Sequence, residues 1–87
     1  MSSYCVVLEQ AAQRDFRGLD SAAARRAQKG LLRLEKAPRP RGVRKLRDLK
    51  PPHYRLRVGD QRILYTVDDS AKTVHIYRIK HRREAYR

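Results

Sequence analysis

Two strand-like stretches, residues 54–58 and 61–67, contain three arginines and are separated by the dipeptide Gly59-Asp60. The first stretch alternates apolar and basic residues, and the second is rich in β-branched and aromatic residues. Both patterns are typical of β-strands. A dipeptide with glycine first is what a two-residue type II′ turn requires. The stretch therefore predicts an antiparallel hairpin, and the turn sets its register.

This register predicts that three guanidinium groups share one face of the hairpin. Arg57 is placed opposite Arg62, and Arg55 lies two residues before Arg57 on the same face. Opposing two arginines costs roughly 0.2–1 kcal/mol in a sheet, so folding does not require the arrangement. A guanidinium matches two phosphate oxygens, and the cluster predicts a phosphate cradle. The alternative is that these arginines are ordinary solvated positions of a basic protein. The other face is the predicted core face, and it carries Tyr54, Leu56, Val58, Ile63, Tyr65 and Val67.

Other residues that can do chemistry carry weaker signals. His53 and His75 are interpreted as surface or hydrogen-bonded sheet residues, and Asp68-Asp69 as a polar turn. Cys5 is the single cysteine. It predicts neither a disulfide nor a cysteine zinc site, and we expect it to be a small core residue. No His, Asp and Glu set has metal-ligand spacing, so no metal and no cofactor are predicted.

The charge of the chain indicates an anionic partner. Of 87 residues, 22 are Lys or Arg and 9 are Asp or Glu, which gives a net charge of +13. Nucleic acid, a membrane surface or an acidic protein would relieve such self-repulsion. No apolar run approaches the roughly 18 residues of a membrane span, and the start of the chain does not resemble a signal peptide. A cytoplasmic protein without membrane association is therefore expected.

The expected fold is α+β, in a single domain over residues 1–87. Its order is a strand, two helices and then three or four strands of an antiparallel sheet, with the helices packed on one sheet face. The chain is expected to finish with one turn of helix. The expected elements are a strand at 4–8, a helix at 10–19, a helix that Asp20 or Ser21 caps and Pro38 ends, a short strand at 43–49, the hairpin, a strand at 73–80 and the terminal turn at 81–87.

Three parts of the sequence together resemble one family. They are Tyr54-Arg-Leu-Arg-Val-Gly-Asp-Gln-Arg-Ile-Leu-Tyr65, Val67-Asp-Asp69 and Ile79-Lys-His-Arg-Arg-Glu-Ala-Tyr-Arg87. In this order, with the two-helix insert, they resemble the RelE toxins of the RelE/ParE superfamily of type II toxin–antitoxin systems. The resemblance implies a microbial RNase-like fold and metal-free, cofactor-free cleavage of mRNA in the ribosomal A site. In that reaction the ribose 2′-hydroxyl attacks the adjacent phosphate and leaves a 2′,3′-cyclic phosphate.

The resemblance also implies roles for individual residues. Arg62 matches the arginine that stabilises the transition state, Arg82 the arginine that assists the leaving group, and Tyr86 the tyrosine that positions or stacks on the substrate. A simple role for Tyr86 in packing the C-terminus is the alternative. Arg55 and Arg57 stand where some relatives carry lysines. Both can hold phosphate, but an arginine is a poor general base.

The proton-transfer group is therefore open, and His81 is the candidate because imidazole titrates near neutral pH. Arg47, with Lys45 beside it, matches a basic residue that lines the cleft of the family. Arg83 is expected to bind RNA next to the catalytic tail. Arg44 belongs to a basic stretch that would contact ribosomal RNA phosphates without reading sequence, the alternative being a generic solvated run of charges. That stretch contains Arg39, Arg41, Arg44, Lys45, Arg47 and Lys50.

The expected partners are the ribosome with its mRNA and an acidic RelB-like antitoxin, which would cover the basic surface and bring the complex to operator DNA. Two alternatives stay open. A ParE-like toxin would share the fold and poison DNA gyrase without cutting RNA. A non-catalytic basic RNA-binding protein would keep the charge without the reaction.

Overall fold

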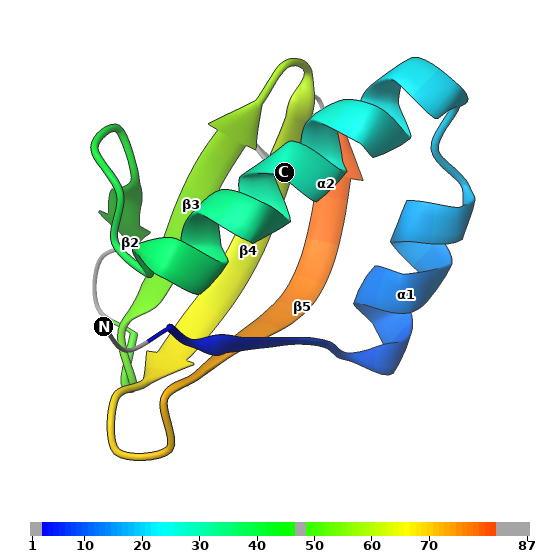
Figure 1. Ribbon diagram of the computed structural model, residues 1–87. Helices are drawn as coiled ribbons and strands as arrows, with labels where there is room; N and C mark the ends of the chain where they lie inside the picture. Colours follow the sequence, from blue (N-terminus) through cyan, green and yellow to red (C-terminus); the bar gives the residue numbers. More distant parts are fainter. Residues whose placement is uncertain (1–2, 47–48, 82–87) are drawn as a thin grey trace.

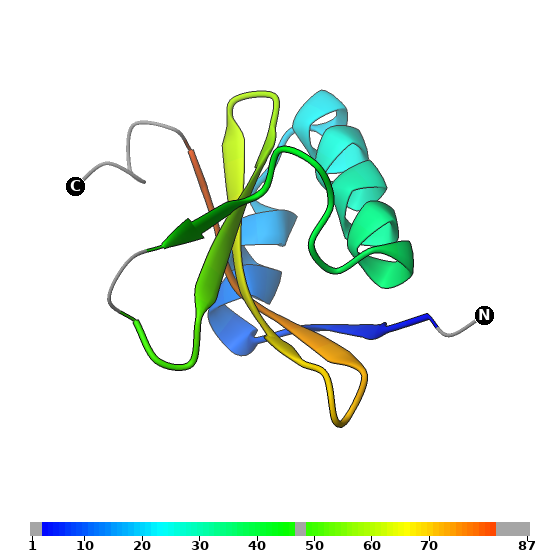
Figure 2. The same ribbon diagram turned by 90° about the vertical axis from the view of Figure 1, so that its left-hand side faces the viewer.

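The computed structural model describes residues 3–46 and 49–81. The strands form one sheet in the order β1-β5-β4-β3-β2. Both helices lie on the same face of this sheet, and α2 runs across the β3–β4 hairpin (Figures 1 and 2). The predicted α+β fold is confirmed, whereas the terminal turn of helix predicted at 81–87 lies outside the described residues, apart from His81, which ends β5. The elements are β1 (Cys5–Leu8), α1 (Gln10–Arg17), α2 (Ser21–Lys36), β2 (Arg44–Leu46), β3 (His53–Val58), β4 (Gln61–Asp68) and β5 (Thr73–His81).

The sheet is mixed rather than purely antiparallel. β1 pairs with β5 in parallel, and the other three neighbouring pairs are antiparallel. A parallel pair needs a long connection between its strands, and α1 with the rest of the chain supplies it. Local sequence patterns do not predict which strand pairs with β1. Within the described residues, neither helix is long and apolar enough to cross a membrane.

The ends of both helices follow from capping chemistry. Asp20, rather than Ser21, caps α2, because its side chain accepts a hydrogen bond of 2.8 Å from the Ala23 backbone N–H. α1 ends at Gly18, whose N–H donates to carbonyls of the last helical turn. α2 ends two residues before Pro38, which cannot continue a helix.

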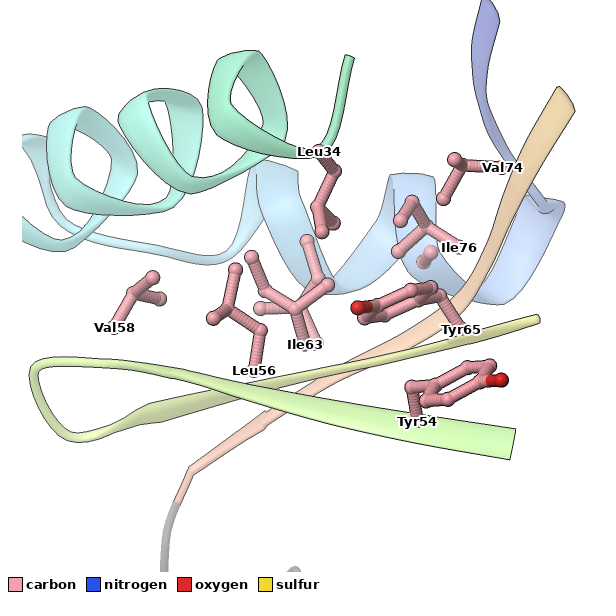
Figure 3. Close-up of a cluster of buried hydrophobic side chains, with 10 residues drawn as sticks. Leu34, Tyr54, Leu56, Val58, Ile63, Tyr65, Val74 and Ile76 are labelled. Carbon is pink, nitrogen blue, oxygen red and sulfur yellow. The ribbon is translucent and has the colours of Figure 1, made fainter. Parts of the chain in front are cut away.

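The core lies between the two helices and the face of the sheet formed by β3, β4 and β5, and Figure 3 shows a part of it. The predicted core face of the hairpin is confirmed, and the rings of Tyr54 and Tyr65 stack with centroids 5.5 Å apart. Gly30 permits close approach of α2, since a Cβ at this position would lie 2.7 Å from Val58 Cγ1. The expectation for Cys5 was wrong. Its side chain is exposed, because β1 is an edge strand and Cys5 faces away from the helices.

The hairpin has the predicted turn and register. Gly59 has φ 64°, as the first turn position of a type II′ turn requires, and Val58 pairs with Gln61. Arg57 consequently pairs with Arg62.

The register between β4 and β5 changes along its length. The partners of Leu64 and Tyr65 on β5 are two residues apart, so β5 contains one additional residue, Tyr77. Such a β-bulge bends the strand and redirects the side chains that follow it. Ile79, beyond the bulge, is thereby buried in the core.

The segment between α2 and β2 is tied to the sheet by hydrogen bonds. Arg39 forms an ion pair of 2.6 Å with Asp69 in the β4–β5 turn, and its Nε donates to the Tyr54 hydroxyl at 3.1 Å. The Tyr65 hydroxyl donates to the Pro38 carbonyl at 2.7 Å. These contacts hold the chain where it approaches β2.

Candidate functional site

Four arginines surround a cavity of about 250 Å³ on the sheet face turned away from the helices. Arg44 of β2 pairs with Arg55 of β3, and Arg57 of β3 pairs with Arg62 of β4. Directly paired residues share a face, so two opposed arginine pairs from three neighbouring strands meet here. The structure therefore brings four of the predicted site residues together around one cavity.

These arginines differ in their exposure. Arg62 is only 4 % exposed, whereas Arg57 and Arg44 are exposed to solvent. Arg57 Nε donates to the Gly59 carbonyl at 3.4 Å. Arg62 Nη1 donates to its neighbouring Gln61 carbonyl at 3.5 Å. A buried cation attracts an anion more strongly than a solvated one, which makes Arg62 the strongest anion-binding group of the cluster.

Glycine at position 42 shapes the rim of the cavity. Gly42 has φ 92°, a backbone conformation that other residues rarely adopt, and no atom lies within 4 Å of the place where its Cβ would be. The chain turns here into β2 and so brings Arg44 beside Arg55.

A fifth cation on this face was missed by sequence reasoning. Lys80 of β5 pairs with Arg62 of β4 and so shares its face. Counting straight back from the β4–β5 turn would have placed Ile79 there instead. The bulge at Tyr77 shifts the register by one residue, and a bulge has no reliable signature in a single sequence.

Two predicted residues are not brought to the cavity. His81 pairs with Gln61, whose partner on β3 is the core residue Val58, so the register places His81 on the opposite face from Arg62. Lys45 pairs with Tyr54 and shares its face rather than that of Arg44. The predicted roles of both residues stay predictions.

Four other predicted residues, Arg47, Arg82, Arg83 and Tyr86, lie outside the described residues. β5 leads directly from Lys80 and His81 into the segment that contains the last three of them. Their roles also stay predictions.

An ion pair fixes β5 just before this segment. Asp15 of α1 accepts hydrogen bonds of 2.8 Å from both Arg78 Nε and the Ile79 backbone N–H. Partial burial would by itself raise the pKa of Asp15, but these hydrogen bonds outweigh it and hold the pKa below its usual range. The carboxylate therefore anchors the strand that carries Lys80.

The arrangement suits a phosphate group. Guanidinium groups from opposite sides can bind several phosphate oxygens at once and stabilise charge that develops on them. A lysine ammonium, unlike a guanidinium, can also release a proton, and the neutral amine that results can accept one. Among residues 3–46 and 49–81, no group of three or more His, Cys, Asp or Glu side chains is arranged to hold a metal ion.

Comparisons with known proteins agree with this fold. Residues 6–86 match the family model described as the ParE toxin of type II toxin–antitoxin systems, parDE. A chain of the archaeal RelE–RelB complex from Pyrococcus horikoshii OT3 is 31 % identical over 91 % of this chain and 94 % of that chain, with a TM-score of 0.80. A chain of the Mycobacterium tuberculosis RelBE2 complex is 30 % identical over 92 % of this chain and 99 % of that chain, also with a TM-score of 0.80.

A third solved structure, the intact Escherichia coli RelBE complex, contains a chain 26 % identical over 90 % of this chain and 95 % of that chain, with a TM-score of 0.77. A search of curated protein sequences returns no significant match. The family model covers nearly the whole sequence, and the two most identical of these structures reach 30 % identity or more over nine-tenths of it. This chain therefore belongs to the RelE/ParE toxins of type II toxin–antitoxin systems.

Proposed function

We propose that this toxin is a metal-independent endoribonuclease that cuts mRNA in the A site of the ribosome. The observation that carries the proposal is the cavity of about 250 Å³ between the opposed pairs Arg44–Arg55 and Arg57–Arg62. Like charges directly opposite one another destabilise a sheet, so an anionic ligand is the simplest physical reason to keep them. In an mRNA endonuclease that ligand is the scissile phosphate.

In the proposed reaction the ribose 2′-hydroxyl attacks the adjacent phosphorus and the 5′-oxygen departs. Arg62, the most buried of the cluster, stabilises the negative charge of the transition state. Arg55 and Arg57 hold the neighbouring phosphate oxygens. Lys80, which pairs with Arg62, joins His81 as a candidate for proton transfer.

The tail supplies the remaining roles of the proposal. Arg82 assists the departing 5′-oxygen, and Tyr86 positions or stacks on the substrate. Both assignments rest on the resemblance of residues 79–87 to the RelE tail.

An antitoxin partner is part of the proposal. The Pyrococcus horikoshii and Escherichia coli relatives were solved in complexes with RelB antitoxins. A net charge of +13 favours an acidic antitoxin segment that covers the basic surface. Such binding would weaken with rising salt, because surface charges are screened.

The test is primer extension on a defined mRNA, with and without ribosomes programmed to hold each codon in the A site. Wild type, Arg62→Ala and the control Arg25→Ala are compared; Arg25 is an exposed arginine of α2, on the helix side of the sheet. We expect ribosome-dependent cuts by wild type and Arg25→Ala, and their loss in Arg62→Ala. Equal cutting of naked RNA would instead assign the chain to ribosome-independent nucleases.

Gyrase inhibition is the second candidate, because the matching family model is described as the ParE toxin. A DNA supercoiling assay with purified gyrase separates the two. Loss of supercoiling without any RNA cleavage would replace the endoribonuclease proposal. Retained ribosome binding without cleavage or gyrase inhibition would favour the non-catalytic RNA-binding alternative.

A further inference from the structure

Beyond the arginine cavity, the same sheet face carries a pair of rings that bridges three strands. His53 of β3 and Tyr77 of β5 have centroids 5.1 Å apart and ring planes at 66°, and His53 Nδ1 lies 2.9 Å from the Tyr77 hydroxyl. β4 runs between these two strands, so the side chains meet above it. Both residues are half-buried.

The ring pair lies next to the arginines along the strand. His53 and Arg55 are two residues apart on β3 and share a face, which corresponds to a separation of about 7 Å. Tyr77 reaches this position because it is the additional residue of the bulge in β5. Bulges are frequent next to functional sites, where they redirect a side chain.

A second cavity, of about 510 Å³, opens beside the ring pair. Thr66 of β4 pairs with both His53 and His75, so this cavity borders the row of the sheet that contains His53. The residues that line it include Pro51, Thr66, Asp68, Asp69 and His75. Its volume is within the range of small-ligand pockets, roughly 300–1,000 Å³.

The chemistry of this cavity differs from that of the arginine cavity. Asp68 and Asp69 both line it, but the Asp69 carboxylate is ion-paired with Arg39, so Asp68 is the carboxylate that disfavours phosphate here. A carboxylate accepts hydrogen bonds from the amino group of a base, and the Thr66 hydroxyl can both donate and accept. A polar, uncharged group fits this lining, and the neighbouring rings of His53 and Tyr77 favour one that is planar.

We propose that the His53–Tyr77 pair and the adjoining cavity form a nucleobase subsite for the RNA strand whose phosphates lie on the arginines. The ring pair stacks a base, and Thr66, Asp68 and His75 bind polar base edges. The proposal rests on the proposed function for the identity of the strand. In this proposal the subsite is the part of the surface that distinguishes one codon from another. The arginines bind every sequence alike, because phosphate contacts carry no base information.

The test uses the three histidines of the chain as reporters. Proton NMR of the full-length toxin follows their imidazole signals while a 2′-O-methyl hexanucleotide, which cannot be cut, is added at physiological salt. A matched hexanucleotide with abasic sites is the control. We expect saturable ring-current shifts of His53 and His75 with the base-containing strand alone. Binding that shifts neither signal, or no binding at all, overturns the subsite.

Variants separate stacking from packing. Tyr77→Leu keeps an apolar side chain over β4 but removes the aromatic face, and Tyr77→Phe keeps that face without the hydroxyl. We expect Tyr77→Leu to abolish the His53 shift and Tyr77→Phe to retain most of it. Equal behaviour of the two folded variants would show that the ring serves packing alone, which contradicts the proposal.

The same variants on programmed ribosomes separate the subsite from the proposed function. We expect Tyr77→Leu to lower kcat/KM on the preferred codon roughly 5- to 150-fold, the value of one stacked base, and to flatten the preference among codons. Leu32→Ala, an exposed site on α2, is the control. Base-dependent shifts without any ribosome-dependent cleavage would support the subsite while contradicting the endonuclease. Ribosome-dependent cleavage by Tyr77→Leu with an unchanged codon preference would support the endonuclease and contradict the subsite.

Discussion

Lys80 lies directly opposite Arg62 on the sheet face that carries the arginine cavity. The amino group of Lys80 can transfer a proton, whereas the guanidinium group of Arg62 beside it cannot. His81, the adjacent residue, pairs with Gln61 of β4 and lies on the other face of the sheet. The structure thus adds a lysine to the candidates for proton transfer in a cluster of arginines.

Substitutions of Lys80 test whether it moves a proton or only supplies charge. If it moves a proton, Lys80→Arg and Lys80→Met should both lower the single-turnover cleavage rate on programmed ribosomes by about 10²- to 10⁴-fold. If it supplies charge, Lys80→Arg should retain most of the rate. His81→Ala is measured beside them. A loss confined to His81→Ala would return proton transfer to the histidine.

Arg62 should dominate the stabilisation of transition-state charge. We expect Arg62→Ala to lower kcat about 10²- to 10³-fold, the usual effect of removing one such donor, with little change in ribosome affinity. Single-turnover cleavage and ribosome cosedimentation measure the two quantities. Arg25→Ala, an exposed arginine of α2, is the matched loss of charge. An equal decrease in both variants would show that only overall charge matters.

Repulsion between the opposed Arg57 and Arg62 should lower the free energy of unfolding of the toxin. Replacing exposed Arg57 by threonine removes the repulsion of Arg62 and introduces a good strand former. We expect Arg57→Thr to raise the free energy of unfolding by roughly 0.2–1 kcal/mol, measured by urea denaturation, and to lower cleavage activity. Unchanged or lower stability would indicate that the pair is not strained in the absence of a ligand.

Gly30 should be required for the close packing of α2 on the hairpin. A Cβ there would lie 2.7 Å from Val58 Cγ1 and 3.1 Å from Ile63 Cδ1. Alanine favours helix by about 1 kcal/mol over glycine, but overpacking a core costs typically 1–3 kcal/mol. We expect Gly30→Ala to be net destabilising in urea denaturation. Gly18→Ala is the control, because its Cβ would meet ordinary contacts of 3.5 Å or more and its φ of −85° is accessible to alanine.

The ion pair between Asp15 and Arg78 should make stability depend on pH. The pKa of Asp15 is lower in the folded chain than in the unfolded chain, so its contribution is complete above the unfolded value of about 4. It is lost as the pH falls through the folded pKa. We therefore expect the wild type to exceed Asp15→Asn in unfolding free energy at pH 7 and the difference to shrink toward pH 3. A constant difference would assign the effect to packing instead of charge.

Local chemistry accounts for the parts of the fold that short stretches of sequence predicted. Asp20 caps α2 because its side chain reaches the Ala23 N–H within the same turn. Arg57 faces Arg62 because a two-residue turn with Gly59 leaves one register available. Each interaction involves neighbours in the chain, which is why these features could be predicted without the rest of the molecule.

Contacts between distant segments decided the remainder of the site. The bulge at Tyr77 lies where β5 packs against α1, and Asp15 of α1 accepts a hydrogen bond from the N–H of Ile79, two residues beyond it. The same bulge places Lys80 opposite Arg62. No local pattern encodes a shift of one residue between strands, because its cost and its benefit both come from tertiary packing.

By itself, then, the sequence determined the α+β order, the hairpin with its facing arginines and a strongly basic surface. The tertiary structure alone decided that β1 lies parallel to β5, that Arg44 joins the cavity across β3, and that Lys80 rather than His81 faces Arg62. The reason is the range of the interactions. Turn and capping preferences act over a few residues, whereas strand pairing and register are selected by burial of the whole core.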